Sequence, residues 1–248
     1  MGGGDQHVEQ IGRELVSRGH RVTVWCADVP THEERRFNRG GVDVIPNGFS
    51  PVEEAPKRPS SLPRREDSRP LISFVGRLSF QKGLDVLMDA MESYGSDPGF
   101  HLAIAGKGEL SGWLEDRHAR SSAKGNISVL GLVTDAEKRW MYENSDCVVI
   151  PSRFEGLPTV LLEAMNAGTP VVMADVNGLG GLVGECGSGL SAPCEDPESL
   201  ALAMSRVIEA DEDQASAWGD SGKSASRDYQ WDRVTDRVLG VYRRVLGE

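Results

Sequence analysis

The sequence predicts an α/β protein built on a Rossmann-like, doubly wound parallel sheet. From residue 71 onward, short apolar segments of strand length alternate with longer segments of helical periodicity. Apolar segments such as residues 147–150 show no alternation with polar residues, which is typical of parallel strands buried on both faces. Glycine-containing loops separate several strands from the helices that follow. This order favours a parallel sheet covered by helices on both faces.

The elements follow one another regularly through this region. We expect strands at residues 71–75, 101–105, 127–130, 147–150, 171–174 and 189–192. We expect helices at residues 84–94, 109–121, 135–144, 159–167, 197–209, 214–228 and 231–246. Asp196 is a candidate helix N-cap, and Gly168 followed by Pro170 is a helix stop signal. The glycine-rich residues 178–181 are interpreted as a flexible segment.

The first 50 residues are organised differently. A glycine turn at residues 2–4, a helix over residues 6–17 and strands at residues 21–26 and 42–45 are predicted. Residues 53–69 are rich in Pro, Ser, Arg and Glu, which is linker composition.

We therefore divide the chain into an N-terminal segment (1–50), a linker (51–69), a Rossmann-like domain (70–230) and a C-terminal helix (231–248). The N-terminal segment is too small to fold alone, so it should pack on the larger domain or be poorly ordered. The C-terminal helix carries an apolar stripe that we expect to lack its partner and to favour self-association. The stripe consists of Val234, Val238, Val241, Tyr242 and Val245.

The composition excludes several classes of function. At 248 residues, with 39% hydrophobic and 26% charged residues, the chain can bury a substantial core. The net charge of −11 argues against a nucleic-acid partner. The chain shows no run of transmembrane length and no signal peptide, and its four cysteines are dispersed. We therefore predict a cytoplasmic protein with no metal site, and leave peripheral membrane contact open.

Two carboxylates frame the loop and helix that follow strand 147–150. Glu155 lies on the loop, and Glu163 lies about one turn into the predicted helix. The N–H groups at a helix start favour a phosphate, whereas a carboxylate only accepts hydrogen bonds and suits sugar hydroxyls. Alternatively, Glu155 is a solvated loop charge and Glu163 a polar-face helix residue. This stretch alone leaves both interpretations open.

Three further loops end strands of the same sheet. The first contains Gly76, which would let a ligand approach the backbone, and two cations, Arg77 and Lys82. The second contains Gly106 and Gly108, and the third contains Gly131. Each loop alone is a weak signal, because glycines also serve ordinary turns. Since the carboxyl ends of parallel strands share one edge, together they favour a crevice for a nucleoside diphosphate.

The ordered set of motifs resembles the nucleotide-sugar half of the family 4 (group 1) glycosyltransferases, over about residues 45–248. The motifs are Phe74-Val75-Gly76-Arg77 with Lys82-Gly83, Ala105-Gly106 with Gly108, and Pro151-Ser152 with Glu155-Gly156, Pro158, Glu163-Ala164, Gly168 and Pro170-Val171. Residues 2–24 separately resemble the start of that family's acceptor domain. The resemblance implies the GT-B fold, in which two Rossmann-like domains face a cleft.

The resemblance also implies a role for each matched residue. Arg77 and Lys82 would neutralise the donor's diphosphate, and Glu155 would lie near the hydroxyls of the transferred sugar. Glu163 would hold the ribose. The backbone of the Gly156, Leu157, Pro158 and Thr159 segment would lie at the phosphate and sugar, and the loops at Gly106, Gly108 and Gly131 would face the base.

Family members typically retain the anomeric configuration and need no metal or other cofactor. The resemblance therefore implies a UDP-, GDP- or ADP-sugar donor and a glycan, lipid or small-molecule acceptor. Asp211-Glu212-Asp213 has the form of a metal-binding D-x-D motif, but a solvated turn is favoured there.

The sequence departs from the family pattern in two places. The acceptor domain's first strand, its middle strands and its catalytic histidine are missing, which predicts a truncated acceptor half. Asn177 to Gly181 replaces the usual Gly-Gly-x-Pro-Glu loop. Two alternatives to an active transferase follow: a catalytically impaired nucleotide-sugar-binding fragment, or a nucleotide-sugar epimerase built on the same domains.

Overall fold

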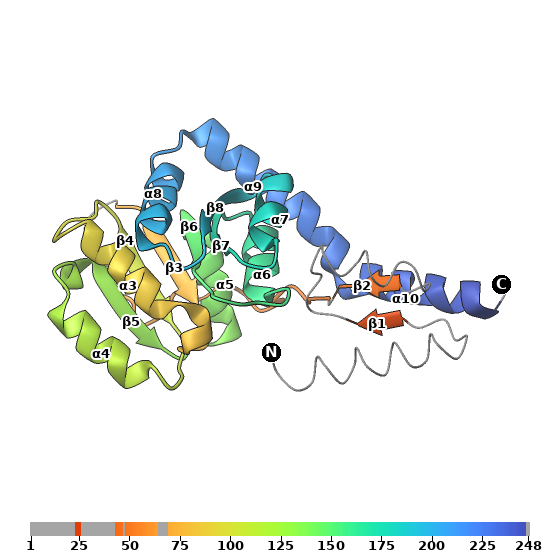
Figure 1. The fold of residues 1–248 in the computed structure, drawn as a ribbon, viewed down its shortest axis with the longest axis horizontal. Helices are drawn as coiled ribbons and strands as arrows, with labels where there is room; N and C mark the ends of the chain where they lie inside the picture. Colours follow the sequence, from red (N-terminus) through yellow and green to blue (C-terminus); the bar gives the residue numbers. More distant parts are fainter. Residues whose placement is uncertain (1–22, 26–42, 47, 64–68, 247–248) are drawn as a thin grey trace.

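A computed structural model describes residues 23–25, 43–46, 48–63 and 69–246. The predicted glycine turn and the helix over residues 6–17 lie outside these residues. In Figure 1 a large α/β body stands beside a small two-stranded sheet, and the C-terminal helix runs from the body to that sheet.

The large body is a six-stranded parallel sheet with the order β5-β4-β3-β6-β7-β8. Its strands are β3 (Leu71–Val75), β4 (His101–Ala105), β5 (Ile127–Gly131), β6 (Cys147–Ile150), β7 (Val171–Asp175) and β8 (Gly189–Pro193). All five strand pairs are parallel, which confirms the predicted sheet. The strand order reverses direction between β3 and β6, so the loops after these two strands open at a topological switch point.

Helices cover both faces of this sheet. They are α3 (Leu84–Ser93), α4 (Ser111–Arg120), α5 (Asp135–Glu143), α6 (Thr159–Ala167), α7 (Leu179–Glu185), α8 (Pro197–Ile208) and α9 (Glu212–Ser226). Apolar residues of α3, α4 and α8 pack with Ile72, Phe74 and neighbouring strand residues in one core cluster. Residues of α5, α6 and α7 pack with alternate strand residues in two further clusters on the other face.

The strands and most helices match the predicted elements to within about two residues, but residues 178–181 do not. They are not a flexible segment, because α7 begins at Leu179. Val183 of α7 is fully buried in the core cluster, and the N–H of Gly180 donates to Asp175 Oδ1 (3.1 Å). Core burial therefore outweighs the low helix propensity of glycine here.

The Asp211–Asp213 motif forms the start of α9. Asp211 is the N-cap, and its side chain accepts a hydrogen bond from the N–H of Gln214 (2.8 Å). A cap of this kind satisfies a backbone donor that the helix itself leaves unpaired.

The described part of the linker lies along α5. The N–H of Lys57 donates to the Ala136 carbonyl (3.0 Å), and the Arg58 guanidinium stacks 5.5 Å from the Trp140 ring centroid. Leu62 is buried in a core cluster with residues of β3 and α5. Despite their linker composition, these residues pack against the Rossmann-like domain.

The small sheet consists of two parallel strands, β1 (Thr23–Trp25) and β2 (Asp43–Ile45). Ile45 packs against Val234 and Val241 of α10 (Trp231–Leu246). These two positions of the apolar stripe thus have a partner within the chain, contrary to the expectation that the stripe lacks one. In the described residues, no helix is both long and apolar enough to cross a membrane.

The chain connects the two bodies twice, and the two connections touch. The N–H of Phe49 donates to the Tyr229 carbonyl (2.9 Å), and Phe49 forms a parallel bridge with Gln230. A Cβ on Gly48 would lie 2.6 Å from the Trp231 ring, so this ring lies directly against the Gly48 backbone.

Candidate functional site

The predicted glycine loops pack against one another along the carboxyl edge of the sheet. The N–H of Gly106 donates to the Gly131 carbonyl (2.8 Å), and the N–H of Gly76 donates to the Ala105 carbonyl (3.0 Å). A Cβ on Gly106, where φ is +144°, would lie 1.8 Å from the Gly76 oxygen. A Cβ on Gly108 would lie 2.3 Å from the Leu78 oxygen. Gly106 and Gly108 are therefore needed for loop-to-loop packing, and not simply for ligand approach as their sequence positions suggested.

The loops after β3 and β6 pack closely together at Gly83. This residue has φ of +63°, and a Cβ on it would lie 2.0 Å from the Pro151 oxygen. The same junction carries hydrogen bonds from the Arg153 N–H to the Gln81 carbonyl (2.8 Å) and from Gln81 Nε2 to the Phe154 carbonyl (3.0 Å). Hydrogen bonds thus hold the two loops at the switch point together.

Lys82 and Glu155 meet across this junction. Lys82 Nζ lies 2.5 Å from Glu155 Oε1, which also accepts from Ser152 Oγ (2.6 Å). From the described residues, the other carboxylate oxygen receives a single long hydrogen bond, donated by Gln81 Nε2 (3.5 Å). Glu155 is 6% exposed, so it is not a solvated loop charge. The structure pairs two of the predicted site residues, with one carboxylate oxygen still able to accept short hydrogen bonds.

Arg77 and the start of α6 remain open to a ligand. The Arg77 side chain is exposed, and no side chain in the described ranges forms an ion pair or hydrogen bond with it. The α6 N-cap is Pro158, which has no side-chain acceptor for the first-turn N–H groups. Pro158 is buried, Gly156 and Leu157 are half-buried, and Thr159 is exposed.

Glu163 has partners of its own on α5. Its two oxygens accept from Lys138 Nζ (2.9 Å) and from the Tyr142 hydroxyl (2.9 Å). Burial lowers the pKa of Lys138, but hydrogen bonds and charge from Glu163 and Asp135 outweigh it and raise that pKa overall. Burial, with the Glu163 charge second, holds the pKa of Tyr142 well above its usual value. Both oxygens of Glu163 are therefore held by α5, and Glu163 is not an ordinary polar-face residue.

A cavity of about 450 Å³ opens beside Glu163. Its lining residues come from the linker, α5, α6 and α9: Pro51, Val52, Arg139, Tyr142, Glu143, Glu163, Asn166, Ala167 and Lys223. Glu155 pairs with Lys82 and Glu163 pairs with Lys138, so the two glutamates lie in separate polar clusters.

Sequence reasoning missed Lys138, which pairs with Glu163, and Arg153, which forms ion pairs of its own on the loop that carries Glu155. Arg153 forms a bidentate ion pair with Asp85 and a second ion pair with Glu195, each at 2.7 Å. Its partners stand 68 and 42 positions away in the chain, so no local motif signals the contacts. For Lys138 the available signal was its position on α5, the helix that precedes the helix of Glu163 in the chain.

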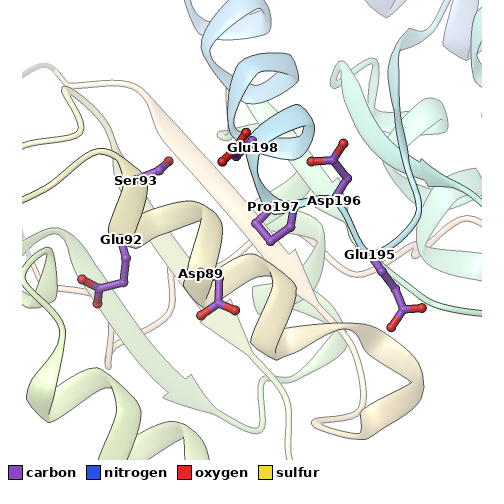
Figure 2. A pocket seen from close by; sticks show the side chains of 7 residues that line it. All are labelled: Asp89, Glu92, Ser93, Glu195, Asp196, Pro197 and Glu198. Atoms are coloured by element: carbon purple, nitrogen blue, oxygen red, sulfur yellow. The ribbon is translucent and has the colours of Figure 1, made fainter.

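A second groove of about 600 Å³ lies between α3 and the start of α8 (Figure 2). Its carboxylates come from Asp89, Glu92, Glu195, Asp196 and Glu198. Figure 2 shows them spread along the groove and not directed at one point. Several are already engaged: Asp89 with Arg117, Glu195 with Arg153, and Asp196 as the α8 cap. Across the described chain, no group of three or more His, Cys, Asp or Glu side chains is arranged to hold a metal ion.

The fold and these clusters define a Rossmann-like α/β domain with an ion pair between the two loops at its switch point. Its family is that of the glycosyl transferases group 1, whose model matches residues 60–225. The chain belongs to this family.

Relatives agree with this assignment. An uncharacterised glycosyltransferase of Methanocaldococcus jannaschii is 33% identical over 185 residues, covering 72% of this chain and 46% of that protein. The D-inositol 3-phosphate glycosyltransferase of Segniliparus rotundus is 29% identical over 246 residues, covering 95% of this chain and 52% of that protein. The chain thus spans about half the length of the relatives that it matches.

A pneumococcal O-GlcNAc transferase solved with UDP and GlcNAc superimposes with a TM-score of 0.65 at 15% identity, over 96% of this chain and 48% of that one. At this identity the likeness concerns the fold alone. It confirms the expected Rossmann-like architecture of a GT-B glycosyltransferase.

Proposed function

We propose that this chain binds a nucleoside diphosphate sugar and takes part in transferring the sugar to an acceptor, with the retaining, metal-independent chemistry of family 4. The Lys82–Glu155 pair at the switch point carries the proposal. It puts a cation suited to a diphosphate next to a carboxylate suited to sugar hydroxyls. In an acidic protein such a cation must be placed locally, because the overall field repels an anionic donor.

The proposed roles follow from the chemistry of each group. In the transfer, the bond from the anomeric carbon to the diphosphate oxygen breaks and a bond to the acceptor oxygen forms. The acceptor's proton leaves with the nucleoside diphosphate. Lys82, Arg77 and the α6 N-terminus would stabilise the negative charge that develops on the diphosphate. The open oxygen of Glu155 would accept sugar hydroxyls, and Glu163 would accept ribose hydroxyls.

Nucleotide binding is the direct test. Thermal shift and calorimetry with UDP, GDP and ADP, each with and without EDTA, should identify one base that binds, with no change on chelation. If none of the three nucleotides binds the purified chain, the proposal is wrong.

A transfer assay then separates an active enzyme from the alternative of an impaired binding fragment. The preferred nucleotide sugar is incubated with glycan, lipid and small-molecule acceptors, and both transfer and hydrolysis are measured. Binding without either product would favour the fragment, whereas transfer with retained configuration would favour the family 4 enzyme.

A further inference from the structure

Arg153 is held by three carboxylate and carbonyl partners from two other segments of the chain. Its guanidinium donates to both oxygens of Asp85 at 2.7 Å, to Glu195 at 2.7 Å and to the Phe80 carbonyl at 3.0 Å. It also stacks on the Phe80 ring at 4.1 Å from the centroid. The side chain is 11% exposed. Such a set of bonds needs the planar fork of arginine, which lysine cannot reproduce.

These contacts join the loops on which the proposed site stands. Asp85 lies in the first turn of α3, directly after the loop that contains Lys82. Arg153 itself stands two residues before Glu155. Glu195 lies in the β8–α8 connection and adopts a positive φ of 59°, an unfavourable conformation for a residue with a side chain. The β8–α8 connection is therefore the third loop joined by Arg153, and its backbone is in an unfavourable conformation at Glu195.

The arrangement leaves the guanidinium little capacity for another ligand. The hydrogen bond to Asp85 is the main reason that the pKa of Arg153 is raised, and the same hydrogen bond is the main reason that the pKa of Asp85 is lowered. Both directions indicate an ion pair that stays charged. Arg77 and Lys82, by contrast, belong to the loop whose edge is open to the site.

We infer that Arg153 is a positioning residue, which sets the separation between Lys82 and Glu155 so that Lys82 can reach the donor's second phosphate. The inference rests on the proposed function, since it assumes that a nucleoside diphosphate binds there. In this role Arg153 links the loops that follow β3, β6 and β8.

The test compares the affinities of UDP and UMP, or of the matching nucleotides if another base is preferred. Arg153→Met and Arg153→Lys should each weaken UDP binding by about 10-fold while changing UMP binding far less, because a misplaced Lys82 affects the second phosphate. Arg117→Met is the control: it removes a more exposed Arg–Asp ion pair, at 2.8 Å, between α4 and α3. It should leave both affinities unchanged.

Two further variants distinguish positioning from direct phosphate binding. Asp85→Asn and Glu195→Gln each remove one of the two ion pairs of the guanidinium. If Arg153 positions Lys82, both variants weaken UDP binding. If Arg153 binds phosphate itself, both strengthen it, and the inference is overturned.

Urea unfolding of every variant serves as the stability readout. A merely structural role would lower the unfolding midpoint and leave the UDP-to-UMP affinity ratio at its wild-type value, which would also overturn the inference. Failure of the wild-type chain to bind any nucleotide would instead contradict the proposed function.

Discussion

Gly83→Ala should both destabilise the protein and disable its nucleotide site. Gly83 ends the short 3-10 helix Phe80–Lys82 and caps the start of α3, with φ of +63°. Its missing Cβ would stand 2.0 Å from the Pro151 oxygen, about 1 Å inside the closest approach that real Cβ atoms make. Since the clash is with backbone, a side-chain rotation cannot relieve it.

The expected magnitude has two parts. An alanine in the left-handed region costs about 1–2 kcal/mol. Forcing apart two packed loops adds about 1–3 kcal/mol, as for other overpacked sites. We therefore expect Gly83→Ala to lower the free energy of unfolding by about 2–5 kcal/mol. A shift of about 1 Å between the loops should also weaken nucleoside diphosphate binding, by up to about 100-fold.

Gly95→Ala provides the matched control. Gly95 has a similar φ of +69°, but a Cβ on it would meet nothing within 4 Å. It should therefore show the conformational cost alone and leave nucleotide binding unchanged. Both variants restrict the unfolded chain equally, so that effect cancels in the comparison.

Urea unfolding of the two variants measures the difference, and calorimetry with UDP, GDP or ADP measures the binding. If Gly83→Ala is no less stable than Gly95→Ala, the close approach of the two loops is not a real constraint. If it is less stable but binds nucleotide normally, the loops can separate without disturbing the site, and the proposed dependence of binding on this junction is wrong.

Three other predictions concern the charged and titrating groups. Lys82→Met should weaken nucleoside diphosphate binding by about 10–100-fold in calorimetry, and it should lower stability in urea because Glu155 loses its cation. The double variant that also carries Glu155→Gln should regain stability but not binding. Glu163→Gln should lower the pKa of Tyr142 toward its usual value without reaching it, because burial remains; tyrosinate absorbance during alkaline titration measures this, and an unchanged pKa would contradict the coupling. Burial raises the pKa of the Cys147 thiol to about 12, so the thiol of the unfolded chain ionises first. The free energy of unfolding should therefore fall as pH rises from about 9 toward 12. Cys147→Ala should flatten this pH dependence in urea unfolding, and an identical slope would refute the prediction.

The sequence allowed the sheet and most helices to be predicted because their signals are local. Buried parallel strands such as 147–150 are apolar throughout, and α6 begins and ends at the residues expected from Pro158 and Gly168. The same local reasoning failed at residues 178–181, where the glycines suggested a loop. Burial of Val183 in a core cluster stabilises a helix there, and that burial is a tertiary contact which the glycine content alone does not indicate.

The candidate site was predictable only in part, for a similar reason. Lys82 and Glu155 each stand in a recognisable local motif, and the structure brings them together. Arg153 stands between motif positions, and its function depends on Asp85 and Glu195, which only the folded sheet places nearby. The purpose of Gly106 was likewise hidden, since the atom that it accommodates belongs to the preceding loop.

The paired connections between the two bodies have a mechanical consequence. A single covalent link would let the small sheet swing and twist freely against the large body. Here Phe49 is hydrogen-bonded to Tyr229 and bridged to Gln230, and Gly48 lies against the Trp231 ring, so the two links form one strap. Two connections held side by side can bend together, but twisting or sliding would break the contacts between them. Any movement of β2 and α10 against the Rossmann-like body should therefore follow a single bending axis.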